Sequence, residues 1–192
     1  MARSATPSRH DSHATTAQGA WSTKRITTLA LFCAASLILS FIEVPIFPPA
    51  PYLKYDPSGI VALVGAFAFG PGMGALIAII TWVVKTLFVF NPWGHLMAVV
   101  ATVTLVVPAG AVYRRTPTMR GAIVGMAIGC AVSVVACVLA NLVVTPLYTS
   151  VDVAAVLAMI VPILLPFNLI KVIVTSVVTA LIYKPVSKAI GD

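Results

Sequence analysis

The stretch LPFNLIKVIVTSVV, residues 165–178, sets three polar side chains into a long apolar run. Asn168, Lys171 and Thr175 recur at three- and four-residue spacing, so on a helix they share one face. An ammonium near the centre of a membrane helix costs about 2.5–3.5 kcal/mol unless it is paired or solvated. The stretch therefore predicts a transmembrane helix whose polar face is a candidate functional site.

The whole chain has the composition of a membrane protein. Its 192 residues are 60% hydrophobic and only 9% charged, whereas a soluble domain is typically about one-quarter charged. Residues 1–23 are polar and rich in Ser, Thr and Ala, and we expect them to form a disordered cytoplasmic tail. Residues 24–192 are expected to form a single all-α integral membrane domain.

Apolar runs of helical length predict six transmembrane helices. They lie at about residues 26–44, 58–70, 73–90, 94–113, 121–145 and 157–183. Gly70-Pro71-Gly72 separates the second run from the third, although fusion of these two runs would leave five spans. Pro166 stands just before Asn168, where it would kink the last helix or free a carbonyl.

The basic residues favour six spans over five. They cluster before the first run, after the fourth and after the last, at Lys24, Arg25, Arg114, Arg115, Arg120, Lys184 and Lys188. Six spans place all three clusters on one side, which the positive-inside rule makes the cytoplasmic side. We therefore expect a multi-pass protein of a prokaryotic cell membrane with both termini in the cytoplasm. This topology accounts for the net charge of +7 without a nucleic-acid partner.

The embedded polar residues fall in the outer half of the predicted bundle. At about 1.5 Å per residue, Lys171 lies about 20 Å from the cytoplasmic end of its helix, and Asn168 lies further out. Asn141 and Glu43 are also near the outer ends of their helices. A water-filled channel would be polar along its whole length, so this asymmetry predicts a cavity open to the outside with a closed apolar floor.

Each of these polar residues also has a structural interpretation. Asn141 and Asn168 would serve equally well as hydrogen-bonding groups between helices. Glu43 either ends the first helix at the membrane interface or pairs with Lys171. Because Asn and Lys together offer donors and an acceptor, they suit a ligand edge with carbonyl oxygens and an imide nitrogen.

Other polar and aromatic residues leave similar alternatives open. Lys85 either snorkels outward or belongs to the site, and His95 is either an interfacial residue or a site residue. The outer-loop aromatics Phe47, Tyr52 and Tyr55 would cover a flat ligand or anchor the loop at the interface.

Several functional classes lack support in the sequence. Cys33, Cys130 and Cys137 lie in apolar runs without metal-ligand spacing, so we expect neither a metal nor a disulfide. No Walker A, GxSxG or HExxH motif is present. A binding protein that depends on a separate ATP-driven motor fits best, and a small membrane enzyme using Lys171, His95 and Glu43 is the alternative.

Small residues recur at four-residue spacing on two of the predicted helices. Ala30 and Ala34 form such a pair on the first, and Gly121, Gly125, Gly129 and Ser133 form a stripe on the fifth. Small residues let helix backbones approach closely. We expect one stripe to serve internal packing and another to face a partner membrane subunit.

Four segments resemble the substrate-binding S component of energy-coupling-factor (ECF) vitamin transporters, and most of all its riboflavin-specific members. These segments are YLKYDPSGIVALVGAFAFGPGMGAL (52–76), VVPAGAVYRR (106–115), ANLVVTPLY (140–148) and PFNLIKVIVTSVVTALIYKPVSK (166–188). The resemblance implies a six-helix bundle with an outward-facing vitamin pocket. It implies riboflavin or FMN as a transported ligand rather than a cofactor, and it implies partnership with a transmembrane coupling subunit and two ATPase subunits.

The resemblance also implies roles for particular residues. Asn141, Asn168 and Lys171 would bind the polar edge of the isoalloxazine ring, and Leu53 and Tyr55 would help enclose the ligand. Ala30 and Ala34 would contact the coupling subunit. The chain departs from the family at GHLMAV (94–99), where His95 replaces an acidic residue. This departure keeps other vitamins, such as thiamine, pantothenate or a flavin analogue, open as substrates.

Overall fold

The computed structural model describes residues 23–46, 48, 50–51, 53–149 and 151–191. The predicted tail at 1–22 and the aromatics Phe47 and Tyr52 lie outside the described residues. The elements are α1 (Thr23–Ser40), β1 (Val44–Pro45), β2 (Lys54–Tyr55), α2 (Ser58–Phe69), α3 (Pro71–Phe88), α4 (Pro92–Arg115), α5 (Met119–Thr149), α6 (Val153–Met159), a π-helical segment η1 (Ile160–Leu164) and α7 (Leu165–Gly191).

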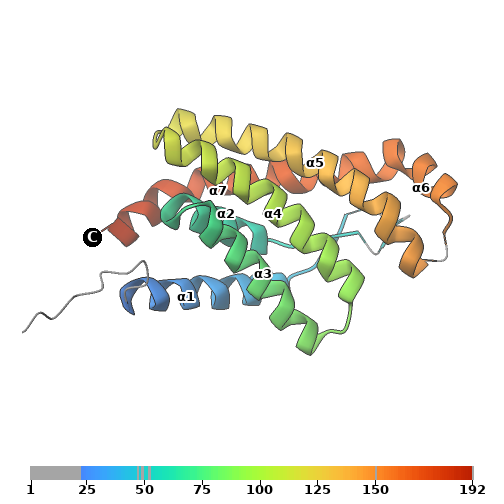
Figure 1. The fold of residues 1–192 in the computed structure, drawn as a ribbon, viewed down its shortest axis with the longest axis horizontal. Coiled ribbons are helices and arrows are strands. Elements are labelled where there is room, and N and C mark those ends of the chain that lie inside the picture. The colour runs from blue at the N-terminus through green and yellow to red at the C-terminus, as the bar shows by residue number, and fades with distance from the viewer. Residues whose placement is uncertain (1–22, 47, 49, 52, 150, 192) are drawn as a thin grey trace, which may run out of the picture.

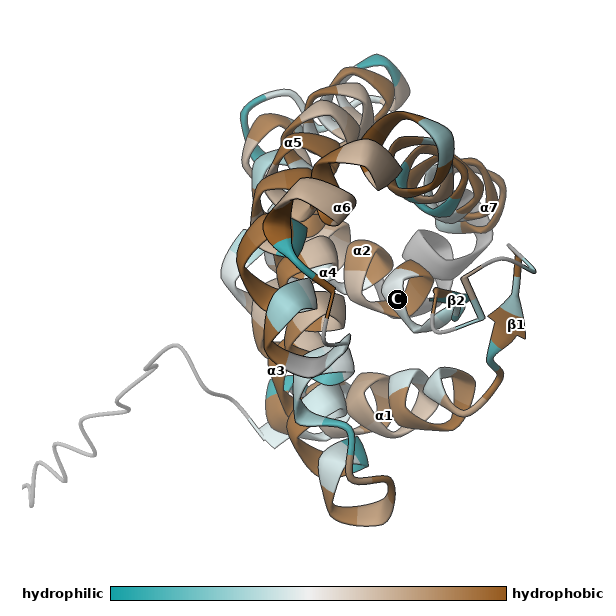
Figure 2. Cartoon of the chain, turned by 90° about the vertical axis from the view of Figure 1, so that its right-hand side faces the viewer, coloured by the Kyte–Doolittle hydropathy of each residue, from teal (hydrophilic) through white to brown (hydrophobic). Residues whose placement is uncertain are grey.

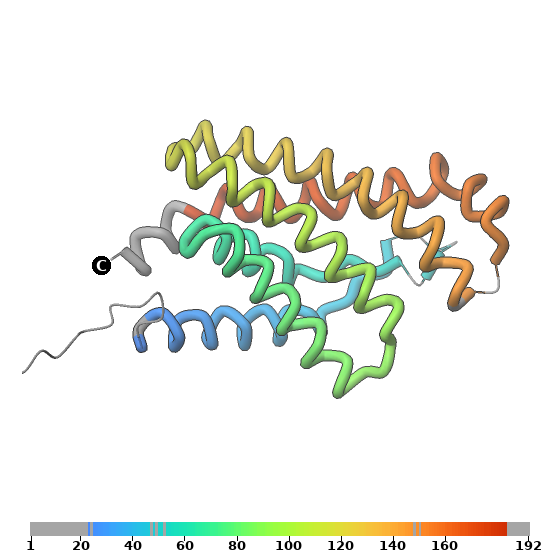
Figure 3. The backbone as a smooth tube through the Cα atoms, viewed as in Figure 1, coloured from blue at the N-terminus to red at the C-terminus, as the bar shows by residue number. Residues whose placement is uncertain are grey.

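The described residues form six helical rods, because α6, η1 and α7 follow one another without a break (Figure 3). The six-helix bundle is thus confirmed, but the predicted spans were not all of the right length. Four rods are long and apolar enough to cross a membrane, whereas α1 and α2 are shorter. The 12 residues of α2 rise only about 18 Å, less than the roughly 30 Å hydrocarbon core of a bilayer.

Two helix boundaries differ from the prediction for local reasons. The first helix ends at Ser40 rather than at residue 44, and Pro45 disfavours helical geometry at Val44, the residue before it. Val44 and Pro45 instead pair antiparallel with Tyr55 and Lys54, so a two-residue ladder forms in a segment predicted as a loop. The last rod begins at Val153, where the Asp152 carboxylate caps the Ala155 N–H at 2.8 Å.

The Gly70-Pro71-Gly72 turn separates α2 from α3 as predicted. Gly70 has φ 100°, a left-handed conformation that residues with a side chain rarely adopt. Gly74 then packs α3 against α2, since a Cβ there would lie 2.7 Å from the Ala62 carbonyl oxygen. Two antiparallel helices therefore replace the single long helix of the five-span alternative.

The small-residue stripe of the fifth helix serves internal packing. A Cβ on Gly125 would lie 2.6 Å from the Ala109 carbonyl oxygen, so α5 contacts the α4 backbone directly. Ser133 continues the stripe, and its hydroxyl donates to the Ala101 carbonyl at 2.8 Å. These small residues bring α4 and α5 close together along most of their length (Figure 1).

The two ends of the bundle differ in chemistry. One end carries the start of α1, the α2–α3 turn, the α4–α5 turn and the end of α7 (Figure 1). Arg25 lies at this end and donates to the Phe69 carbonyl at 3.3 Å, and Arg114 and Arg115 complete the last turn of α4. The opposite end holds the β1–β2 hairpin and α6. The basic clusters that the structure describes thus share one end, as their spacing predicted.

The basic end is closed by aromatic packing. The Phe67 ring lies 4.8 Å from the Tyr113 ring and 5.4 Å from the Tyr183 ring, and the two tyrosine hydroxyls contact each other. These residues join α2, α4 and α7 and form an apolar floor. At the other end lies the hairpin segment, by which we mean the described residues from Glu43 to Pro57, including β1 and β2. Its Leu53 packs with Phe167 in a second hydrophobic cluster. Seen from that end, the helices are mostly hydrophobic and the hairpin lies between α1 and α7 (Figure 2).

Candidate functional site

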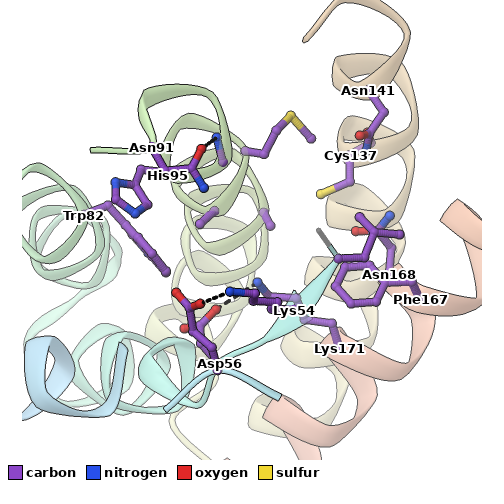
Figure 4. A pocket seen from close by; sticks show the side chains of 16 residues that line it. Lys54, Asp56, Trp82, Asn91, His95, Cys137, Asn141, Phe167, Asn168 and Lys171 are labelled. Carbon is purple, nitrogen blue, oxygen red and sulfur yellow. Dashed lines mark hydrogen bonds and ion pairs between the residues drawn. The ribbon is translucent and has the colours of Figure 1, made fainter. Parts of the chain in front are cut away.

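A cavity of about 230 Å³ lies between the hairpin segment, α3, α4, α5 and α7, toward the end of the bundle opposite the basic residues. Figure 4 shows its lining, with side chains from α5 and α7 facing those from α3 and α4. Five of the six predicted ligand-binding residues line it, namely Glu43, Leu53, Asn141, Asn168 and Lys171. Small-molecule sites combine such a cavity with a few oriented polar groups.

Lys171 is held by an ion pair inside the cavity wall. Its Nζ lies 3.1 Å from Asp56 Oδ2, and the side chains are only 14% and 6% exposed. The other Asp56 oxygen accepts hydrogen bonds from the backbone N–H and the hydroxyl of Ser58. Asp56 therefore offsets the cost of burying the Lys171 ammonium. The alternative pairing of Lys171 with Glu43 was wrong.

The two asparagines are oriented by bonds to their own helices. Asn168 Nδ2 donates to the Leu164 carbonyl at 2.7 Å, and Asn141 Nδ2 donates to the Cys137 carbonyl at 2.8 Å. Asn141 Oδ1 accepts from Thr145 at 2.9 Å. Each amide keeps a second N–H donor, and Asn168 Oδ1 accepts no hydrogen bond from the described residues. The α5–α7 wall therefore offers donors, an acceptor and a cation.

A local change in helix type precedes Asn168. The π-helical η1 ends at Leu164, and the Leu165 N–H bonds to the Ile160 carbonyl, five residues back. We predicted a kink or a free carbonyl at Pro166. The departure from α-helical hydrogen bonding instead occupies the turn just before Pro166. Pro166 has no N–H to offer the preceding turn, and single π turns occur frequently at functional sites.

The opposite wall places Trp82 of α3 beside His95 of α4. Both side chains are about 5% exposed and line the cavity, and their ring centroids are 5.2 Å apart. His95 Nδ1 lies 2.7 Å from Thr86 Oγ1. His95 is therefore a buried residue of the cavity wall rather than an interfacial residue. The Trp82 indole N–H is enclosed and has no hydrogen-bond partner among the described residues.

Glu43 joins two lysines at the edge of the cavity. It lies 2.6 Å from Lys85 and 2.7 Å from Lys54. Lys85 is only 1% exposed; its ammonium also donates to the Ser40 carbonyl and lies 4.7 Å from the centroid of the Trp82 ring. The alternative in which Lys85 snorkels outward was wrong, because Glu43 and the Ser40 carbonyl satisfy its ammonium inside the bundle.

The Glu43 carboxylate is kept ionised by these contacts. Partial burial alone would raise the pKa of Glu43, but the hydrogen bonds from Lys54 and Lys85 outweigh burial and lower the pKa below its usual value. The three residues of the enzyme alternative line the same cavity, but each is paired with a different residue. Glu43 pairs with Lys54 and Lys85, His95 with Thr86, and Lys171 with Asp56.

Tyr55 is the predicted ligand residue that the cavity lining omits. It follows Lys54 on β2, and successive side chains of a strand point to opposite faces. Burial raises the pKa of Tyr55, and its hydroxyl interacts with Thr175, the third member of the polar face of α7. In this arrangement Tyr55 ties the hairpin to α7, and the position of Lys54 in the cavity wall follows from that contact.

Comparison with known proteins identifies the family. Residues 24–183 match the model of the substrate-specific component of ECF transporters. This chain belongs to the ECF transporter S components. The match runs from the first turn of α1 to residue 183 in α7. The family is membrane-embedded, and its members are substrate-binding components of transporters rather than enzymes.

Two relatives support this assignment. The S component is similar to the riboflavin transporter RibU of Staphylococcus aureus (strain TCH60), with 33% identity over 104 residues; these cover 54% of this chain and 55% of the relative. The chain thus spans about half the length of that curated relative. It also resembles a solved structure described as the S component of a bacterial ECF transporter, with 28% identity and a TM-score of 0.77, covering 88% of this chain and 98% of the other.

The predicted coupling residues lie outside the ligand cavity. Ala30 and Ala34 are both exposed on α1, so their small side chains form part of the surface of the S component. They form a strip of small side chains on α1, where larger apolar residues such as Leu31 and Ile38 are also exposed, at 65% and 68%.

Sequence reasoning did not assign most residues of the cavity lining to the site, among them Asp56, Trp82 and Phe167. The sequence did hold a signal for Asp56. An Asp side chain often accepts a hydrogen bond from the backbone N–H two residues later, and Asp56 accepts one from Ser58 at the start of α2. Trp82 and Phe167 are apolar side chains within largely apolar runs, so the local pattern does not distinguish them from their hydrophobic neighbours. Only the packing of α3 and α7 shows which of those side chains face the cavity.

Proposed function

We propose that this S component captures riboflavin from outside the cell membrane with high affinity and performs no chemistry on it. The observation that carries the proposal is the α5–α7 wall, on which Asn141, Asn168 and Lys171 line one cavity. The pyrimidine edge of a flavin carries two carbonyl oxygens and an imide N–H. An ammonium and amide donors suit the carbonyl oxygens, and Asn168 Oδ1 suits the imide. The 33% identity to a riboflavin transporter supports the same ligand.

A binding measurement on the purified protein tests this proposal. Flavin that co-purifies would give a yellow protein, and titration of the ligand-free protein would quench flavin fluorescence with saturation at one site. We expect riboflavin to bind more tightly than thiamine or pantothenate, and FMN serves as the phosphorylated comparison. Saturable binding of thiamine or pantothenate without binding of riboflavin or FMN would reassign the S component to another vitamin.

We further propose that both termini lie in the cytoplasm and that the cavity opens to the outside. The basic residues at one end of the bundle support this orientation, and the cavity is lined by residues toward the other end. Protease protection of terminal epitope tags in sealed cells and inverted vesicles tests it. Cleavage of either tag from the outside of intact cells would contradict it.

Uptake would then require a transmembrane coupling subunit and two ATPase subunits, because the S component has no nucleotide-binding motif of its own. We propose the exposed Ala30–Ala34 strip of α1 as the contact with the coupling subunit, since small residues permit close helix approach. Co-purification of the S component with those subunits from a common membrane tests this partnership.

A further inference from the structure

The cavity wall opposite the amides contains a histidine whose tautomer is fixed by its neighbours. His95 Nδ1 lies 2.7 Å from Thr86 Oγ1, and the same Thr86 oxygen lies 2.7 Å from the Trp82 carbonyl oxygen. Both distances are those of hydrogen bonds, so each pair must share a proton.

Only one assignment of protons satisfies both contacts. The Trp82 carbonyl has no proton, so the Thr86 hydroxyl donates to it. A hydroxyl has a single proton, and Thr86 therefore accepts the hydrogen bond from His95 Nδ1–H. In the neutral imidazole the other nitrogen, Nε2, is then unprotonated and acts as an acceptor.

Nε2 faces the cavity without a protein partner. None of the hydrogen bonds or ion pairs formed by the described residues involves it, and it is not among their enclosed atoms without a partner. Because His95 lines the cavity, the open space that Nε2 contacts is the cavity (Figure 4). The Trp82 ring, 5.2 Å away, fixes the plane of the imidazole. A ligand thus meets a fixed acceptor on the α4 side, and amide donors, an amide acceptor and an ammonium on the α5–α7 side.

A fixed neutral acceptor selects for a particular chemistry. It binds a ligand hydroxyl, which can donate; it gains nothing from an alkyl group, and it repels an oxyanion, which can only accept. The complementary ligand group on this side is therefore a hydroxylated side chain.

We propose that His95 Nε2 accepts a hydrogen bond from a hydroxyl of the ligand side chain and makes the S component select flavins with a polyhydroxylated N10 substituent over N10-alkyl flavins. The inference rests on the proposed flavin ligand. It assigns His95 to substrate selection, and it assigns Thr86 the role of a positioning residue that keeps the Nδ1 proton in place.

The test compares the affinities of two ligands for the full-length S component in detergent. Riboflavin carries a ribityl chain at N10, whereas lumiflavin carries a methyl group there, and both report binding by fluorescence quenching. We expect His95→Phe to weaken riboflavin binding about three- to tenfold, the range of one neutral hydrogen bond. Lumiflavin binding should change much less, so the preference for riboflavin falls.

Two further variants separate hydrogen bonding from shape. His95→Gln keeps an acceptor near the position of Nε2 and should restore part of the preference that His95→Phe loses. Thr86→Val removes the hydroxyl that fixes the tautomer without changing a cavity-lining side chain. It should lower the preference for riboflavin in the same direction, and it provides the test if His95→Phe fails to fold.

The outcomes distinguish this inference from the proposed function. Equal weakening of both ligands by His95→Phe, or an unchanged riboflavin preference in both His95→Phe and Thr86→Val, would overturn the role of His95 while leaving riboflavin as the ligand. If the wild-type protein bound neither flavin, the proposed function itself would fail, and the inference with it.

Discussion

Lys171 and Asp56, 115 positions apart in the chain, meet at 3.1 Å in the wall of the cavity. This pair joins the last helix to the segment that leads into α2, and it holds Lys171 in the lining of the cavity that Asn141 and Asn168 also line. The polar face of α7 therefore has two functions. It closes the hairpin segment onto the bundle, and it presents charged and polar atoms to the cavity.

Substitution of the pair should separate ligand binding from stability. We expect Lys171→Ala to weaken riboflavin binding at least about tenfold, or roughly 1.4 kcal/mol. It should also lower the melting temperature, because it leaves the Asp56 carboxylate buried without its cation. The double variant Lys171→Met/Asp56→Asn should regain much of the stability but not the affinity. Fluorescence titration and thermal unfolding in detergent measure the two effects.

Two outcomes would contradict this interpretation. Wild-type affinity in a folded Lys171→Ala protein would make the lysine a packing residue. Recovery of affinity in the double variant would mean that the charge pair acts only by holding the hairpin segment in place.

The amides provide a second prediction. Asn168→Ala should weaken riboflavin binding at least about tenfold, because it removes both the Oδ1 acceptor and the free N–H on the cavity side. Leu169→Ala is the matched control, since Leu169 is the next residue of α7 and is 40% exposed on the outer surface. The titration that tests Lys171 also tests this pair. Equal affinities in the two variants would show that Asn168 only supports the helix.

The sequence was sufficient to predict the six-helix bundle and several of the polar residues that line the cavity, for physical reasons. Polar residues in an apolar run are costly unless they have a partner or a site, so Asn168 and Lys171 stood out. The positions of the basic residues and the Gly70 turn indicated six helices rather than five. The partner of Lys171 was not predictable, because Glu43 and Asp56 both lay at the outer end and only tertiary packing chooses between them.

Other features lacked any local signal. Whether the Trp82 side chain faces the cavity depends on how α3 packs against α4. Whether Lys85 is buried depends on where α1 ends. The π-helical segment likewise lies just before Pro166, where Leu164 and Phe167 pack with Leu53 of the hairpin segment. These are interactions between elements, which a pattern within one element does not specify.

The stability of the Glu43 cluster should depend on pH. The folded-state pKa of Glu43 is lower than its usual value of 4.5, so its stabilising contribution is fully present above about pH 4.5 and is lost as the pH falls through the lowered value. At neutral pH Glu43→Gln should lower the melting temperature, because Lys85 is then buried without its anion. The difference from wild type should shrink in acid, where wild-type Glu43 is itself protonated.

Melting curves of both proteins from about pH 7 to about pH 3 measure this dependence. Lys54→Met is the control within the cluster. Lys54 is 47% exposed in its side chain, and exposed ion pairs contribute little, so its loss should matter less than the loss of Glu43. A constant difference between Glu43→Gln and wild type at every pH would rule out the charge of Glu43 as the cause.

The last prediction separates ligand capture from uptake. Ala30→Leu adds bulk to the exposed strip of α1, away from the cavity, so riboflavin affinity should remain at the wild-type value. Uptake by cells that also contain the coupling subunit and both ATPase subunits should fall, because a larger side chain prevents close helix contact. Ala127→Leu, at another exposed alanine on α5, is the matched control and should leave uptake unchanged. Equal uptake by the two variants would remove α1 as the coupling surface, and loss of binding in Ala30→Leu would refute the division of the S component into a binding region and a coupling region.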